Sequence, residues 1–173
     1  MKNILIVLLI LFSFLVAAGT VSADIPVAQS SAKIKTNNIN SYSDYRINTL
    51  KNYLESHNSP LASYAGSFVL CADKYDLDWR FVAAISGVES TFGKRIPFNS
   101  YNAYGWANGT YYFDSWDESI EIVSKALREK YINKGATTID QIARIYAPPS
   151  STWGSNVKFF MKKIDAVPME FTL

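Results

Sequence analysis

The sequence contains one cysteine and one histidine in 173 residues, and the scarcity of both excludes several kinds of chemistry. Cys71 alone cannot form an intramolecular disulfide, so packing has to stabilise the domain. A zinc site needs three or four tight ligands, which Cys71 and His57 do not supply. A cysteine peptidase needs an exposed thiolate with a histidine in reach, whereas Cys71 lies in the apolar stretch GSFVLCADKY. We therefore expect a buried cysteine, no metal and no cofactor.

Neither sign of charge is in large excess. The 17 basic and 15 acidic residues leave a net charge of +2 and are scattered along the chain. Nucleic-acid-binding domains carry a concentrated basic face, and no such concentration is present. We expect a monomer without a nucleic-acid partner.

The N-terminus predicts export. Lys2 precedes an apolar run over residues 4–18, and Val21-Ser22-Ala23 follows it. This pattern is typical of a signal peptide over residues 1–23, cleaved after Ala23. An uncleaved membrane anchor is the alternative, although the run is short for a span. Either reading places the protein outside the cytoplasm, secreted or in the cell envelope.

The remainder predicts a linker and one domain. Residues 24–43 are rich in Ser, Asn and Ala without sustained periodicity, which is typical of a flexible tether. Residues 44–173 are long enough for one domain with its own core. Helical spacing of apolar residues, with capping signals, predicts helices over residues 44–56, 60–74, 78–92, 115–131, 138–147 and 152–164.

One segment departs from the helical pattern. Asn108-Gly109 stands between the aromatic runs 104–107 and 110–113, which predicts a tight two-residue β-hairpin. The expected fold is therefore mainly α (α+β), with about six helices around a small β-hairpin.

Glu89 occupies an unusual position for a carboxylate. It falls in the last turn of the helix predicted over residues 78–92, where the partial negative charge of the helix end disfavours an anion. Apolar neighbours such as Phe92 would also withhold water from it. Both influences raise the pKa of a carboxyl group, as a general acid for glycosidic cleavage requires. The competing interpretation is an exposed glutamate on a surface turn.

The segment after Glu89 is aromatic. Residues 98–116 hold eight of the 25 aromatic side chains, Tyr104, Trp106 and Tyr112 among them. Aromatic faces pack on the apolar faces of sugar rings, which favours a glycan groove, although some of these rings have to fill the core. Ordinary glycosidases use a second carboxylate, but residues 90–113 contain none, and Asp114 suits a helix cap. The 2-acetamido group of an N-acetylated substrate can replace that carboxylate.

Three short motifs follow one another along the chain, namely Glu89-Ser90-Thr91-Phe92-Gly93, Asn102-Ala103-Tyr104-Gly105 and Tyr146-Ala147. In this respect the chain resembles the glucosaminidase family of lysozyme-like peptidoglycan hydrolases, the mannosyl-glycoprotein endo-β-N-acetylglucosaminidase type, over about residues 75–164. The resemblance implies a lysozyme-like fold and a substrate made of alternating N-acetylglucosamine and N-acetylmuramic acid.

The resemblance also implies roles for individual residues. Glu89 and Tyr146 are the expected catalytic pair. The expected substrate-binding residues are Ser90, Asn102, Tyr104 and Gly105, with Trp106 and Tyr112 from the aromatic segment. Hydrolase and lytic transglycosylase remain open, as do a non-catalytic wall-binding domain and a tethered adhesion module. Trp153 fits either an outer-subsite platform or a lid over the core.

Overall fold

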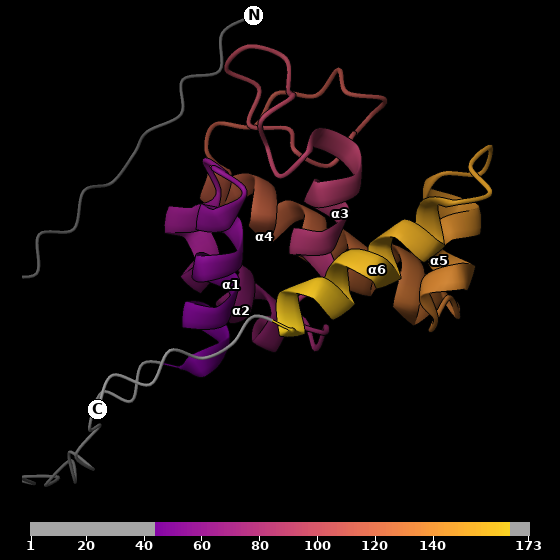
Figure 1. The fold of residues 1–173 in the computed structure, drawn as a ribbon. Helices are drawn as coiled ribbons and strands as arrows, with labels where there is room; N and C mark the ends of the chain where they lie inside the picture. Colours follow the sequence, from indigo (N-terminus) through magenta and orange to yellow (C-terminus); the bar gives the residue numbers. More distant parts are fainter. Residues whose placement is uncertain (1–43, 167–173) are drawn as a thin grey trace, which may run out of the picture. The chain divides into compact units, whose positions relative to one another are not determined.

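The structure, a computed structural model, describes residues 44–166. The predicted signal peptide or anchor (1–23) and the linker (24–43) lie outside the described residues. Six α-helices joined by short helical turns and loops form the described part (Figure 1). They are α1 (Tyr45–Ser56), α2 (Ala65–Lys74), α3 (Phe81–Ser90), α4 (Trp116–Ala126), α5 (Ile139–Tyr146) and α6 (Trp153–Asp165). The prediction of a mainly helical fold is confirmed. Within residues 44–166 no helix has the length and apolar character needed to cross a membrane.

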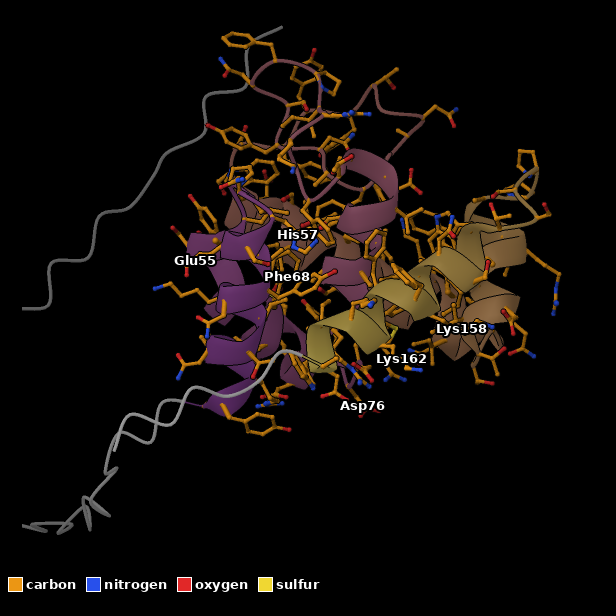
Figure 2. All side chains as sticks on the ribbon, viewed as in Figure 1. Glu55, His57, Phe68, Asp76, Lys158 and Lys162 are labelled. Atoms are coloured by element: carbon orange, nitrogen blue, oxygen red, sulfur yellow. The ribbon has the colours of Figure 1, made fainter. Side chains whose placement is uncertain are left out.

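Helix α3 lies at the centre of the core. Residues 81–87 are all buried, and α6 packs against this helix, crossing it at an angle (Figure 1). The other helices contribute fully buried side chains, listed in chain order as Leu50, Leu54, Phe68, Ile120, Val123, Val157 and Ile164. Figure 2 labels Phe68 among the interior side chains, and burying a side chain of this size contributes about 1.5–3 kcal/mol.

Most helices begin near the capping residues expected from the sequence, although the details differ at two of them. The capping box at Thr138 and Gln141 is present at the start of α5. At the start of α4, the Ser115 hydroxyl accepts from the Glu118 amide, but the Glu118 carboxylate binds the amide of Asp114 instead of closing the box. The helix predicted from residue 60 begins as a 3-10 turn, η1 (Ala62–Tyr64).

The turn that ends α3 is unusually tight. Thr91, Phe92 and Gly93 all have left-handed backbone conformations, with φ of 54°, 59° and 78°. The helix therefore ends at Ser90, earlier than the predicted end at residue 92, and Glu89 lies in its last turn as predicted. A left-handed residue with a Cβ costs about 1–2 kcal/mol, and such costs are concentrated at functional sites.

The predicted hairpin is wrong. Within residues 44–166 there is no strand, and residues 94–115 form an irregular loop. Asn108 and Gly109 do adopt left-handed conformations, as a hairpin turn would require. The backbone groups on either side of this turn bond to a side chain and not to a partner strand. The Asn102 side chain donates to the carbonyls of Trp106 and Tyr111 and accepts from the Trp106 amide, at 2.9–3.0 Å. One amide side chain thus takes the positions that cross-strand partners would have filled.

Candidate active site

Glu89 lies half-buried at the end of α3, between α6 and the loop 94–115. Its Oε1 accepts a 2.7 Å hydrogen bond from the indole Nε1 of Trp153, the first residue of α6. Its Oε2 points toward Gly105, since a Cβ added to this glycine would lie 2.8 Å from that oxygen. The two carboxyl oxygens therefore have different surroundings.

The environment of Glu89 favours its neutral form. Burial raises the pKa of this carboxyl, and the hydrogen bond from Trp153 opposes the rise without cancelling it. No neighbouring carboxylate of the described residues contributes to the shift. The prediction of a raised pKa therefore agrees with the structure, and burial is its main cause.

Both the backbone conformation and the lack of space for a side chain favour glycine at position 105. Its φ of +64° lies in the left-handed region, and a side chain there would meet the Glu89 carboxylate. It also lines a cavity of about 300 Å³, together with Trp106, Ala107, Asn108, Tyr131 and Tyr146. Gly105 thus lies between Oε2 and this cavity, and Glu89 itself is not among the residues that line the cavity.

Tyr146 connects α5 to the same site. Its hydroxyl donates a 2.6 Å hydrogen bond to the carbonyl oxygen of Tyr104, and its ring stacks on Trp153 with centroids 4.8 Å apart. Burial raises the pKa of Tyr146, and the nearby Glu89 adds to this rise. The phenol therefore stays protonated and serves as a donor.

Three of the predicted substrate-binding side chains face the interior. Ser90, Asn102 and Tyr104 are at most 3 % exposed. The Ser90 hydroxyl donates to the carbonyls of Ser86 and Ala103 and accepts from the amide of Gly93. These contacts fix the α3 turn and the loop, so these residues shape the site and do not offer a free surface to a ligand.

Trp106 and Tyr112 occupy different places. Trp106 is partly buried and lines the cavity, so it is available to a bound ring. Tyr112 is 58 % exposed and is not among the residues that line this cavity, and Phe98, at 87 %, is the most exposed of the large hydrophobic side chains described. The structure therefore brings together Glu89, Gly105, Trp106 and Tyr146 and leaves Tyr112 on the outside of the loop.

Two residues of the site were not assigned to it from the sequence. Trp153 is 3 % exposed and bonded to Glu89, so it is neither an outer platform nor only a lid. Tyr131 ends a π-helical turn, η2 (Leu127–Tyr131), that follows α4 directly. Such turns are often found at functional sites, but their position is not readable from apolar spacing.

Cys71, the single cysteine of the sequence, belongs to α2. Cys71 is buried, as predicted, and donates to the Glu121 carboxylate at 3.2 Å. Burial, with a smaller contribution from Glu121, raises the pKa of this thiol to about 12, which makes it a poor nucleophile. Among residues 44–166 no group of three or more His, Cys, Asp or Glu side chains is arranged to hold a metal ion.

Comparison with known proteins adds no identification, because no family model and no curated protein sequence matches the chain.

Proposed function

We propose that the protein is an exported glycosidase with a lysozyme-like fold that cuts the glycan backbone of bacterial peptidoglycan. The activity is of the endo-β-N-acetylglucosaminidase type, with Glu89 as general acid. One observation carries the proposal: a half-buried carboxyl with a raised pKa directs one oxygen toward a glycine that lines a 300 Å³ cavity. A carboxyl whose pKa is raised, close to a cavity that can hold a sugar, suits protonation of a leaving sugar.

The first chemical step is proton transfer to the glycosidic oxygen. Glu89 donates the proton as the bond between this oxygen and the anomeric carbon breaks, so the leaving sugar departs as an alcohol. The anomeric carbon retains the positive charge. Glu89, now a carboxylate, later accepts a proton from the group that attacks this carbon, which returns the acid to its starting state.

The charge at the anomeric carbon needs a partner. Since no carboxylate of residues 44–166 contributes to the pKa shift of Glu89, the carbonyl oxygen of the substrate's own 2-acetamido group is the favoured nucleophile. Water then opens the cyclic intermediate and yields a reducing end. Attack by a 6-hydroxyl of the substrate would instead yield an anhydro-sugar, which is the lytic transglycosylase outcome.

The surrounding residues supply shape and orientation. Trp106 offers an aromatic face to a sugar ring in the cavity, and Tyr146 holds the loop at the Tyr104 carbonyl. Ser90 and Asn102 act indirectly, through the loop. Tyr112, exposed on the outer side, is available to a more distant part of a glycan strand.

The test is the variant Glu89→Gln, which keeps the shape of the side chain and removes its acidic proton. Purified peptidoglycan is incubated with each protein, and the soluble products are analysed by mass spectrometry. We expect the wild type to release fragments and Glu89→Gln to release none, while the exposed Glu129→Gln behaves as wild type. A reducing-end product would indicate hydrolysis and an anhydro product transglycosylation. Equal product release by Glu89→Gln would refute the assignment.

The alternative function is a non-catalytic wall-binding domain, which is supported because no carboxylate in the described part of the chain contributes to the pKa shift of Glu89. That protein would sediment with insoluble peptidoglycan and release no product. A tethered adhesion module, dependent on residues 1–43, would in addition remain in the membrane fraction.

A further inference from the structure

The indole of Trp153 is buried against the carboxyl group of Glu89, and three contacts hold this residue in place. Its Nε1 donates to Oε1 at 2.7 Å, its ring stacks on Tyr146, and its backbone amide donates to the Ser150 hydroxyl at 3.1 Å. We propose that Trp153 is a positioning residue that keeps the acidic proton of Glu89 on Oε2, the oxygen facing Gly105. This inference rests on the proposed role of Glu89 as general acid.

The two oxygens of a protonated carboxyl differ in what they can do. The hydroxyl oxygen donates its proton, and the carbonyl oxygen is the better acceptor. Because the N–H of Trp153 can only donate, it favours the arrangement in which Oε1 is the carbonyl oxygen. The proton then resides on Oε2. Without this donor the two arrangements would be closer in free energy, and part of the enzyme would hold the proton on the oxygen that faces the indole.

The direction of the indole N–H is fixed by its neighbours. Its stacking partner Tyr146 is itself held by the 2.6 Å bond from its hydroxyl to the Tyr104 carbonyl. The two rings are inclined by 27°, with centroids 4.8 Å apart, so rotation of the indole would break this stack. The carboxyl group, by contrast, sits beside a residue without a side chain. Oε2 therefore lies close to the backbone of Gly105, and this glycine in turn lines the cavity.

The other groups that face Glu89 do not provide an alternative donor. Tyr146 of α5 is the titratable side chain whose pKa responds to Glu89, and its hydroxyl is already committed to Tyr104. Tyr131 and Tyr104 help to raise the pKa of Tyr146. Neither of them is a cause of the shift in the pKa of Glu89. No Lys, Arg, His, Asp or Glu of the described residues contributes to that shift. Among residues 44–166, Trp153 is thus the hydrogen-bond donor to this carboxyl.

The experiment compares the wild type with Trp153→Phe, which retains an aromatic ring beside Tyr146 and loses the N–H. Glutamate carboxyl carbons are labelled with ¹³C and titrated by NMR in the full chain, and Glu89→Gln assigns the resonance. Since a donor to the anion is removed, we expect the titration midpoint of Glu89 to rise by about one pH unit. The matched control Trp116→Phe removes a buried indole that contacts Tyr101 and should leave the midpoint unchanged.

Activity gives a second readout. With the proton no longer confined to Oε2, we expect a loss of about tenfold in kcat at the pH optimum, and the alkaline limb of the pH profile should move upward with the NMR midpoint. An unchanged midpoint in Trp153→Phe would overturn the inference. If the midpoint moves but the wild type releases no product from peptidoglycan, the positioning of the proton stands and the proposed glycosidase activity fails.

The wild-type protein provides an independent measurement if Trp153→Phe does not fold. The indole N–H proton resonance of Trp153 should shift as Glu89 titrates, and this shift should be absent in Glu89→Gln. An indole resonance that does not respond to the titration of Glu89 would contradict the proposed hydrogen bond.

Discussion

The hydroxyl of Tyr146 donates a 2.6 Å hydrogen bond to the carbonyl oxygen of Tyr104, which ties α5 to the loop across 42 positions of sequence. Tyr104 itself is fully buried, and the next residue is Gly105 beside Glu89. The bond therefore fixes the loop where it passes the carboxyl group. Tyr146 acts on the site through this carbonyl and through its stack with Trp153.

The substitution Tyr146→Phe tests this relationship. It keeps the ring on Trp153 and leaves the Tyr104 carbonyl without its donor, so we expect the free energy of unfolding to fall by about 1–2 kcal/mol. A looser loop should raise KM and lower kcat on peptidoglycan. Chemical denaturation and steady-state kinetics measure the two effects. Tyr111→Phe is the control, because its ring contact with Phe113 is retained. Equal behaviour of the two variants would contradict the role of the hydroxyl.

The substitution Gly105→Ala should affect activity much more than the fold. Its Cβ would lie 2.8 Å from Oε2, and the simplest relief is displacement of the Glu89 carboxylate. Gly109→Ala is the matched control, because Gly109 is also left-handed, with φ +79°, and has open space at its Cβ position. Each variant should lose about 1–2 kcal/mol of stability from backbone strain. Only Gly105→Ala should also lose glycan cleavage, by about a hundredfold or more, in the muropeptide assay.

The sequence predicted the helices well because their signals are local. Apolar spacing and caps such as Thr138 with Gln141 act within a few residues of each other, and the helices begin and end near the expected positions. The same applies to Glu89, whose place in the last turn of α3 follows from the helix itself.

The conformation of the loop 94–115 and the residues that contact Glu89 could not be predicted from local sequence signals. The hairpin prediction failed because the side chain of Asn102 binds backbone groups at Trp106 and Tyr111, and turn signals at Asn108-Gly109 do not contain that information. Trp153 reaches Glu89 from 64 positions away, by the crossing of α6 over α3. Contacts of this range depend on how helices pack, which local pattern does not specify.

Glu89 should destabilise the folded protein at neutral pH. Burial raises the pKa of this carboxyl above its unfolded value, so the folded state binds the proton more tightly. Stability is therefore highest below the unfolded pKa and falls as pH rises through the interval between the unfolded and folded values. Glu89→Gln removes this loss while its amide oxygen can still accept from Trp153. We expect this variant to melt at a higher temperature than wild type at pH 7, with the difference closing near pH 4. A constant difference across this range would contradict the raised pKa.

Glu121 should show the opposite dependence. Burial acts to raise the pKa of this carboxyl, but hydrogen bonds from Lys74, Tyr75 and Cys71 outweigh it and lower the pKa to about 2. Its contribution to stability is then present above the unfolded pKa and is lost as pH falls toward 2. These hydrogen bonds join α2 to α4. The variant Glu121→Gln should therefore melt at a lower temperature than wild type at pH 7, and the two melting temperatures should approach each other in acid. Thermal melts of both glutamine variants between pH 3 and pH 7 should therefore diverge from wild type in opposite directions as pH rises. Divergence in the same direction would show that one of the two carboxyls is placed differently in solution.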